Sequence, residues 1–201
     1  DYAHQGGLSV ALVEAELVGG ECSYWACMPS KALLRPVELT SAAHAMPGVP
    51  IGDWLDADQV FARRNQFTHD YDDSSQVSWA EGAGISVVRG HGRITGERTV
   101  EVTAADGSTQ TLTATHAVCI AVGTSAAIPP IPGLREAKPW TSREVTALKS
   151  VPRRTIVIGG GVVGCESTTW LNGLGSEVTL AVRDDRLLAR NEPFAGELLL
   201  E

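Results

Sequence analysis

The stretch that decides the fold is RTIVIGGGVVGCESTTWLNGLGSEVTLAVRDD, residues 154–185. An apolar, β-branched run leads into a glycine turn, a helical pattern follows over 162–174, and a second apolar run follows at 177–182. Strand, glycine turn, helix and strand in this order are typical of a parallel α/β sheet. The stretch therefore predicts one unit of a doubly wound α/β fold.

The glycines of this turn have the spacing G-x-G-x-x-G, at Gly159, Gly161 and Gly164. Because the turn follows a strand and opens a helix, the spacing favours dinucleotide binding over a turn without a ligand. The first glycine permits the turn, the second lets the backbone approach a pyrophosphate, and the third lets helix and strand pack closely. The helix N-terminus would face the phosphates.

The residues after the second strand indicate whether the chain binds NADP(H) or NAD(H). A strand of this kind often ends on an acid that accepts from the ribose 2′-OH, but Val182 stands there, followed by Arg183 and later Arg190. Arginine would bind a 2′-phosphate that a carboxylate would repel. We therefore expect NADP(H) in preference to NAD(H); the alternative is that these arginines form a solvated surface.

Composition narrows the possible partners and location. The chain has 201 residues and a net charge of −8. This charge disfavours nucleic acid and anionic membranes as partners, and no apolar run reaches membrane-spanning length. Four cysteines are too few for a secreted disulfide scaffold, so we expect a cytoplasmic protein.

The remaining pattern predicts two Rossmann-like units, both incomplete, and a small antiparallel β-meander. We place the first unit at 1–148 and the second at 149–201. Expected elements are a helix tail at 1–7, a buried parallel strand at 8–14, helices over 22–45 and 56–81, a strand at 84–90, the meander at 92–114, a buried strand at 116–123 and a short helix within 136–154.

Glu14 closes the strand at 8–14, where a ribose-binding acid belongs in a dinucleotide fold. The glycine turn of such a fold lies roughly 20 residues earlier. We therefore expect the first strand and its glycine loop to precede residue 1, and further chain to follow residue 201. The alternative is that Glu14 is an ordinary surface acid.

A close cysteine pair, Cys22 and Cys27, lies in GGECSYWACMPSK, residues 19–31. Five residues of a straight helix advance about 7.5 Å, beyond the roughly 7 Å Cα separation that a disulfide spans. A bridge therefore needs a distorted helix start, which Pro29 permits, and a strained bridge is readily reduced. The helix N-terminus and Lys31 should lower the thiol pKa.

Zinc binding is the alternative role of the pair, but a structural zinc site requires four ligands, and the chain has no second pair with ligand spacing. The other cysteines, Cys119 and Cys165, fall in apolar stretches and are expected in the core. The five histidines show no ligand pattern, so no metal site is predicted.

Three motifs, GGECSYWACMPSK, IAVGTSAAIPPIPG and GGGVVGCE followed by GSEVTL, resemble the flavin-dependent pyridine nucleotide–disulfide oxidoreductases. This family includes dihydrolipoamide dehydrogenase, glutathione reductase and mercuric reductase, and the resemblance covers essentially the whole chain. It implies an FAD domain followed by a nicotinamide domain, usually within a homodimer.

Carried over position by position, the resemblance implies that Cys27 lies nearest the flavin, Cys22 attacks the substrate, and Lys31 pairs with Glu166 beside the flavin. These are the expected catalytic residues. The expected cofactor-binding residues are Glu14, Gly20, Cys22, Lys31, His91, Gly92, Ala121, Val122 and Gly123 for FAD, and Gly159, Gly161, Val162, Val163, Gly164, Glu166, Arg183 and Arg190 for the nicotinamide nucleotide.

The chain departs from the family pattern at several places. The family's C-x-N-x-G-C has Tyr24 and Ala26 in place of Asn and Gly, with Trp25 between them. The family's A-T-G stretch reads A-V-G at 121–123, and none of the five histidines matches its acid/base histidine. The substrate side of the cysteine pair is therefore expected to be bulkier.

The resemblance implies transfer of electrons from NAD(P)H through FAD to the Cys22–Cys27 disulfide and on to a small-molecule or disulfide substrate. One alternative is a nucleotide-binding fragment without turnover. Another is a quinone reductase or nicotinamide transhydrogenase relative that does not use the disulfide. Lipoamide, a glutathione-like disulfide, mercuric ion and quinone all remain open as acceptors.

Overall fold

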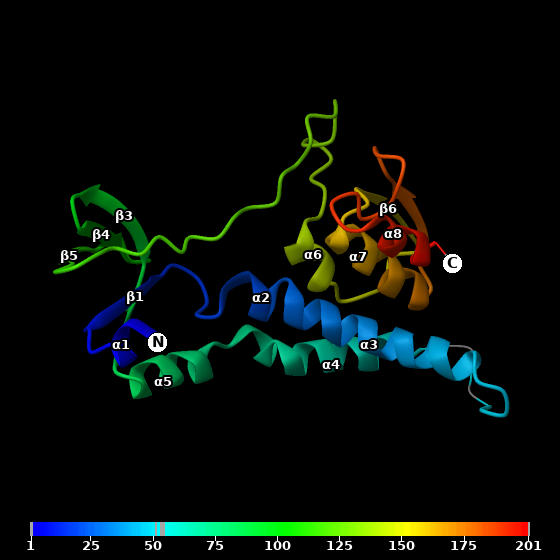
Figure 1. Cartoon of the computed structure of the whole chain (residues 1–201), viewed down its shortest axis with the longest axis horizontal. Coiled ribbons are helices and arrows are strands. Elements are labelled where there is room, and N and C mark those ends of the chain that lie inside the picture. Colours follow the sequence, from blue (N-terminus) through cyan, green and yellow to red (C-terminus); the bar gives the residue numbers. More distant parts are fainter. Residues whose placement is uncertain (1, 51, 53–54, 201) are drawn as a thin grey trace. The chain divides into compact units, whose positions relative to one another are not determined.

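The computed structural model describes residues 2–50, 52 and 55–200 (Figure 1). The chain divides into two compact units: unit 1 comprises residues 1–20 and 71–125, and unit 2 comprises residues 21–70 and 126–201. The two units therefore do not coincide with the domains 1–148 and 149–201 that the sequence predicts. The boundary at 148/149, between a FAD-binding and a nicotinamide-binding domain, stays a prediction.

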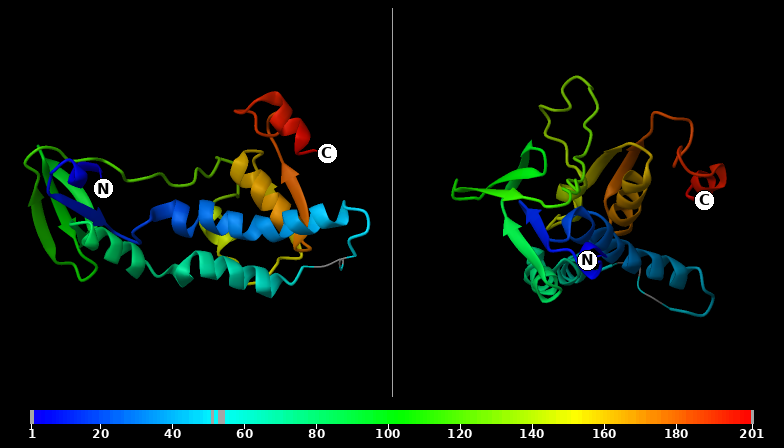
Figure 2. Two further views of the ribbon diagram at one scale, coloured as in Figure 1. Left: turned by 60° about the horizontal axis from the view of Figure 1, so that its bottom comes forward. Right: turned by 60° about the vertical axis from the view of Figure 1, so that its left-hand side comes forward.

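Unit 1 joins a parallel strand pair to an antiparallel meander (Figure 2). In the parallel pair, Val10 lies opposite Ile85 and Glu14 opposite Arg89. The meander has the strand order β3-β4-β5, as the alternating pattern at 92–114 predicts. Its elements are α1 (Tyr2–Gln5), β1 (Val10–Glu14), α5 (Ser74–Gly82), β2 (Ile85–Arg89), β3 (His91–Gly96), β4 (Thr99–Thr103) and β5 (Thr109–Thr113).

The buried strand expected at 116–123 is wrong. These residues form no strand, Cys119 is exposed, and the Ile120 and Val122 side chains are 68% and 87% exposed. A strand persists only through a hydrogen-bonded neighbour, and among the described residues β1 pairs with β2 alone. For the same reason β1 is only partly covered, with Leu12 36% exposed.

Unit 2 contains the predicted strand, glycine turn, helix and strand. Strands β6 and β7 are parallel, with Arg154 opposite Glu177 and Ile158 opposite Ala181. The elements are α2 (Gly20–Tyr24), α3 (Cys27–His44), α4 (Ala57–Phe67), α6 (Ser142–Thr146), β6 (Arg154–Ile158), α7 (Val162–Gly173), β7 (Glu177–Ala181) and α8 (Pro193–Leu198). The α/β fold class expected from the sequence is confirmed.

The helical stretch expected over 56–81 is interrupted. Asp56 caps α4 by accepting from the backbone N–H groups of Asp58 and Gln59, but after Thr68 three successive residues, 69–71, adopt positive φ in a short 3-10 turn. The left-handed region is most accessible to Asn, Asp and His among non-glycine residues. The helical pattern therefore breaks into α4 and α5.

The core of unit 2 lies between α3, α4, α6 and α7. Trp170, Leu33 and Leu171 are fully buried in it, and burial of each such side chain stabilises the fold by about 1.5–3 kcal/mol. Gly173 lets α7 approach α3, since a Cβ there would lie 2.4 Å from a Val37 methyl carbon. The remaining core residues are Leu34, Val37, Val60, Phe61 and Val145.

Within residues 2–50, 52 and 55–200, no helix is both long enough and apolar enough to cross a bilayer.

Candidate functional site

The cysteine pair lies at a break between two helices of unit 2. Cys22 belongs to α2, which ends at Tyr24, and Cys27 is the first residue of α3. Between them Ala26 has φ −137° and ψ −96°, outside the helical region. Both thiols are exposed and unbridged. The distorted helix start that a bridge would require is therefore present.

The two thiols lie within hydrogen-bonding reach of each other. This contact raises the pKa of Cys22; burial and the proximity of a charged Cys27 sulfur act in the same direction. The backbone N–H of Cys27 and the Lys31 ammonium act against the rise, but more weakly. The expectation of a lowered thiol pKa is therefore wrong for Cys22, because the neighbouring thiol outweighs the helix N-terminus.

Lys31 and Glu166 form the ion pair that the resemblance implies. The Lys31 Nζ atom lies 2.5 Å from Glu166 Oε1, and the Ser30 hydroxyl donates to Glu166 Oε2 at 2.6 Å. The packing of α7 on α3 brings Glu166 to this position. Lys31 is four residues after Cys27, so both lie on one face of α3. The pair therefore stands one turn from the dithiol.

In the turn before α7, the backbone requires glycine at two of the three positions of the motif. Gly159 has φ +113°, where side chains are strained, and a Cβ on Gly164 would lie 2.0 Å from the Gly159 carbonyl oxygen. Gly161 caps α7 and faces open space, with no atom within 4 Å of a Cβ built there. Side chains are therefore disfavoured at Gly159 and Gly164, whereas the space around Gly161 is open.

The residues beside this turn are exposed. Val162 and Val163, at the start of α7, are 52% and 56% exposed. Arg183 is exposed and lies 3.3 Å from the Asp184 carboxylate, and Arg190 is exposed as well. Arg186 instead donates to backbone carbonyls of the same loop. Cys165 is buried, as expected, and burial raises its pKa.

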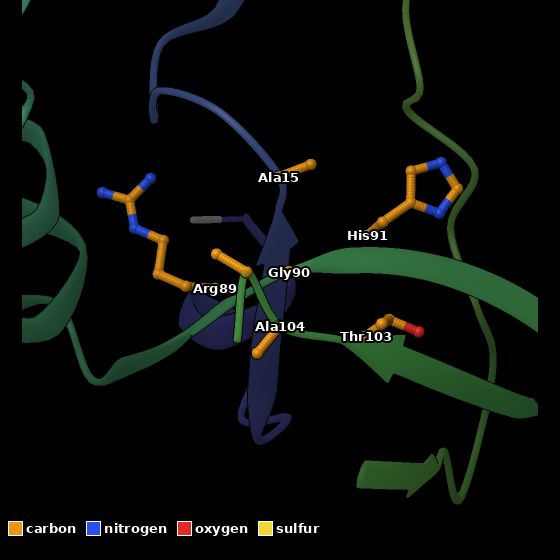
Figure 3. Close-up of a pocket in the computed structure, with 7 residues that line it drawn as sticks. Ala15, Arg89, Gly90, His91, Thr103 and Ala104 are labelled. Carbon is orange, nitrogen blue, oxygen red and sulfur yellow. The ribbon is translucent and has the colours of Figure 1, made fainter. Parts of the chain in front are cut away.

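In unit 1, Glu14 ends β1 with its side chain held in place. Its Oε1 atom accepts from the backbone N–H of Glu16 at 2.8 Å, and its carbonyl accepts from Gly90 at 3.0 Å. A depression of about 390 Å³ lies beside it, where Arg89 points to one side and His91 and Thr103 to the other (Figure 3). Its lining is Ala15, Arg89, Gly90, His91, Thr103, Ala104 and Ala105.

The glycines around His91 serve close backbone packing. A Cβ on Gly90 would lie 2.6 Å from the Thr103 carbonyl oxygen, and one on Gly92 would lie 3.1 Å from a Val13 methyl carbon. Gly20 has φ +61° and open space around it. Ala121, Val122 and Gly123 lie in the extended segment that forms no strand. Their predicted cofactor contacts stay predictions.

Two groups of polar contacts were not predicted from the sequence. Arg143 on α6 bonds to Glu21 and stacks on Trp25, beside the dithiol. In unit 1, buried Asp73 accepts from Arg89 at 2.5 Å and from the backbone N–H of Val18 at 2.6 Å. The only local signal was the T-x-x-E capping box that begins α6; it marks the helix but not the target of Arg143.

The part of the chain that the structure describes contains no cluster of three or more His, Cys, Asp or Glu residues that could hold a metal ion. The pair Cys22 and Cys27 has no further ligand group beside it there. The described site is therefore a dithiol with an adjacent ion pair.

Comparisons with known proteins identify a family for the chain. The family model for pyridine nucleotide-disulphide oxidoreductases matches residues 1–201. The chain is 34% identical to a mercuric reductase of Bacillus cereus over 94% of its length, and 36% identical to a dihydrolipoyl dehydrogenase of Chlorobaculum parvum over 98%. The solved structure of LpdA from Mycobacterium tuberculosis matches with a TM-score of 0.79 at 25% identity, over 98% of this chain.

The chain belongs to the pyridine nucleotide-disulphide oxidoreductase family. The predicted family and fold class are confirmed, and the named relatives are oxidoreductases. The chain spans 30% of the mercuric reductase, 42% of the dihydrolipoyl dehydrogenase and 44% of LpdA.

Proposed function

We propose that this chain forms the dithiol and nucleotide-binding part of an FAD-dependent NAD(P)H:disulfide oxidoreductase. The observation that carries the proposal is the contact between the Cys22 and Cys27 thiols, one helical turn before the Lys31–Glu166 pair. Family membership supports it, because the family couples a pyridine nucleotide with a disulphide.

The two thiols would divide the reaction between them. Cys22, as a thiolate, attacks one sulfur of a substrate disulfide and releases one thiol. Cys27 then attacks the Cys22 sulfur, which releases the second thiol and leaves the Cys22–Cys27 bridge. The dithiol has lost two electrons and two protons, and the substrate has become two thiols. FAD, when bound, would supply the two-electron exchange that restores the dithiol at the expense of NAD(P)H.

The residues present fit both nucleotides. The open space at Gly161 and the α7 N-terminus suit a pyrophosphate. Glu14, held at the end of β1, suits a ribose of FAD, and the depression bordered by His91 lies next to it. We propose that the remaining FAD contacts implied by the resemblance, including Gly20 and residues 121–123, hold as well.

NADP(H) is the proposed nicotinamide. Arg183 is exposed after β7 and no acid ends that strand, so a 2′-phosphate would meet a cation. Asp184 lies beside Arg183 and would weaken the preference. The acceptor is proposed as a disulfide or a related small molecule, with a homodimer and a cytoplasmic location as expected from the resemblance and the composition.

Thiol titration of the protein loaded with FAD tests the proposal. NADPH should release two thiols per chain, mapped to Cys22 and Cys27 by alkylation and mass spectrometry. Cys119→Ser should leave the two new thiols in place, because Cys119 is exposed but unrelated to the pair. Cys27→Ser should remove the long-wavelength band that a thiolate beside oxidised flavin would produce in the two-electron-reduced protein. Its survival would reverse the assignment of the two thiols.

Two other outcomes would point elsewhere. A protein that oxidises NADPH with a quinone or a second nicotinamide, but releases no thiol, would be a relative that does not use the disulfide. A colourless protein that retains no flavin would support a nucleotide-binding fragment without turnover.

A further inference from the structure

The break between α2 and α3 decides whether the two sulfurs can touch. An unbroken helix would place Cys22 and Cys27 about 7.5 Å apart along its axis, beyond the reach of a disulfide. The non-helical backbone of Ala26 removes that separation. Any group that fixes the break therefore also fixes the cysteine pair.

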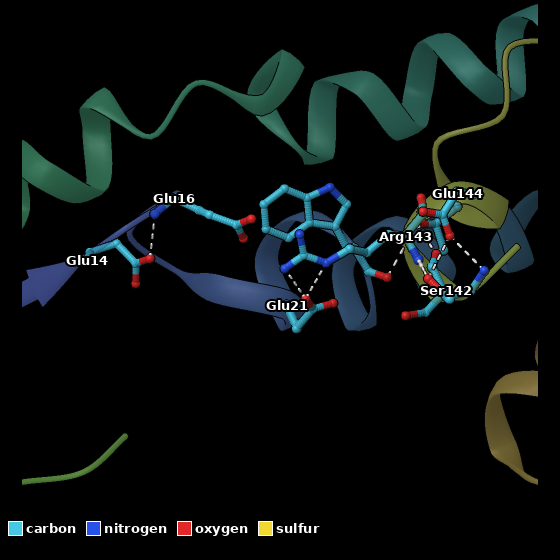
Figure 4. Close-up of polar contacts among 9 residues, drawn as sticks. Glu14, Glu16, Glu21, Ser142, Arg143 and Glu144 are labelled. Atoms are coloured by element: carbon cyan, nitrogen blue, oxygen red, sulfur yellow. Dashed lines mark hydrogen bonds and ion pairs between the residues drawn. The ribbon is translucent and has the colours of Figure 1, made fainter. Parts of the chain in front are cut away.

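Arg143, 116 positions after Cys27 in the sequence, contacts the turn of α2 that leads into the break. Its Nε atom donates to Glu21 Oε1 at 2.6 Å, and Nη2 contacts the same oxygen (Figure 4). Its guanidinium carbon lies 4.1 Å from the centre of the Trp25 ring. Glu21 immediately precedes Cys22, and Trp25 comes two residues before Cys27. The backbone N–H of Trp25 donates to the Glu21 carbonyl oxygen at 2.8 Å, so one planar side chain holds the whole turn that carries Cys22 against α6.

The backbone and the aromatic rings of the break are also fixed. The Thr146 hydroxyl lies 2.8 Å from the Ser142 carbonyl oxygen, its shortest acceptor, and 3.3 Å from the Trp25 carbonyl oxygen. The Tyr24 ring is fully buried and lies 5.7 Å from the Trp25 ring. Trp25 is therefore held through its ring, which contacts the Arg143 guanidinium and the buried Tyr24 ring, with Thr146 close to its carbonyl group.

The helix that carries Arg143 is itself firmly placed. Thr141 and Glu144 form a capping box, with Thr141 N donating to Glu144 Oε2 at 2.7 Å. Arg64, 3% exposed, donates to the carbonyl oxygens of Thr146 and Leu148 and so binds α6 to α4. Arg143 therefore transmits the position of a core-anchored helix to the break.

We propose that Arg143 is a positioning residue for the Cys22–Cys27 pair: through Glu21 and Trp25 it holds the helix break in the geometry that lets the disulfide form. The proposal rests on the proposed function in that it concerns the same pair. The reaction it affects is the exchange in which the dithiol and glutathione disulfide give the Cys22–Cys27 bridge and two glutathione thiols.

The expected effect follows from the geometry. Without the clamp, the break can relax toward a continuous helix, which separates the sulfurs and lowers the effective concentration of one thiol at the other. We expect the equilibrium constant for the bridge against glutathione to fall about tenfold, equivalent to about 30 mV in a two-electron couple.

The test equilibrates the protein in a series of glutathione ratios at pH 7 and counts reduced Cys22 and Cys27 by alkylation and mass spectrometry. Arg143→Met, which keeps the stem and loses the guanidinium, should show the tenfold shift. Glu21→Gln should shift in the same direction, and adding it to Arg143→Met should add little. Arg35→Met is the matched control, because Arg35 pairs with Glu38 on the exposed face of α3.

Thermal unfolding and circular dichroism accompany each variant, and Arg143→Lys serves if Arg143→Met does not fold. Lysine keeps the charge but lacks the planar guanidinium that contacts Glu21 and stacks on Trp25, so we expect an intermediate shift in the equilibrium constant. Equal equilibrium constants in the wild type and every Arg143 variant would overturn the proposal while leaving the proposed function standing. A wild-type protein that forms the bridge with glutathione but releases no thiol with NADPH would overturn the proposed function and leave the proposal for Arg143 standing.

Discussion

The Lys31 ammonium lies 2.5 Å from the carboxylate of Glu166, although 135 positions separate the two residues. The Lys31 side chain is 60% exposed and that of Glu166 23%. A pair this open contributes little to folding, about 1 kcal/mol or less. Its position one turn after Cys27 agrees with the role proposed for it in the dithiol chemistry.

Glu166→Gln should separate these two roles. The free energy of unfolding should fall by about 1 kcal/mol or less. NADPH-dependent thiol release should slow by about tenfold, which corresponds to about 1.4 kcal/mol in the barrier, because Lys31 loses the charge that orients it. Glu38→Gln, at the exposed pair on the same helix, should change neither. Equal thiol release in the Glu166 variant and the wild type would contradict the assignment.

The glycine turn offers a matched pair of substitutions. Gly164→Ala should destabilise the fold by about 1–3 kcal/mol, since its Cβ would meet the Gly159 carbonyl oxygen. Gly161→Ala should fold almost normally, because its Cβ meets nothing, yet it should weaken NADPH binding by filling the space proposed for the pyrophosphate. Chemical denaturation and nucleotide titration distinguish the two. Unchanged NADPH affinity in Gly161→Ala would remove the turn from the site.

The raised pKa of Cys22 predicts how its reactivity depends on pH. The hydrogen-bonded Cys27 thiol is the largest cause of the rise. In the reduced protein, alkylation of Cys22 should therefore increase with a midpoint above that of an ordinary thiol, and Cys27→Ala should move this midpoint down. Peptide mapping isolates the rate at Cys22, with exposed Cys119 as an internal reference. A midpoint unmoved by Cys27→Ala would show that the thiols do not interact.

Asp73 links the stability of unit 1 to pH. Burial alone would raise its pKa, but hydrogen bonds from Arg89 and Val18 and the Arg89 charge outweigh burial and lower it. The carboxylate therefore stabilises the fold above its unfolded pKa of about 3.9, and this contribution disappears as pH falls through the folded value. Asp73→Asn should cost about 2 kcal/mol at pH 7 and progressively less below pH 4. Denaturant unfolding of both proteins at several pH values measures the difference, and a constant difference across this range would contradict the assignment.

Arg183 tests the nicotinamide preference. Arg183→Ala should raise the KM for NADPH more than that for NADH, because only NADPH carries the 2′-phosphate. The loss of one exposed charge-assisted contact predicts a change of about tenfold or less in the ratio. Arg35→Ala, another exposed arginine beside an acid, is the control. A change of equal size for both nucleotides would rule out a phosphate contact.

Local sequence patterns predicted the structure correctly where only the backbone conformation of neighbouring residues was involved. The G-x-G-x-x-G spacing predicted the turn between β6 and α7, where a side chain would be strained at Gly159 by its positive φ and would clash at Gly164 with the Gly159 carbonyl oxygen. The cysteine spacing required a helix break, and Ala26 supplies it. The same reasoning failed at 116–123, because an apolar run becomes a strand only when a neighbouring strand accepts its hydrogen bonds.

By itself, the sequence determined the α/β fold class, the glycine turn and the thiol chemistry on offer, since these depend on residues within a few positions of one another. Only the tertiary structure decided which distant side chains surround the thiols. The packing of α7 on α3 brings Glu166 to Lys31, and the anchoring of α6 brings Arg143 to Trp25. These contacts join residues more than 100 positions apart, so no local periodicity encodes them; they arise because buried surfaces fix the helices relative to one another.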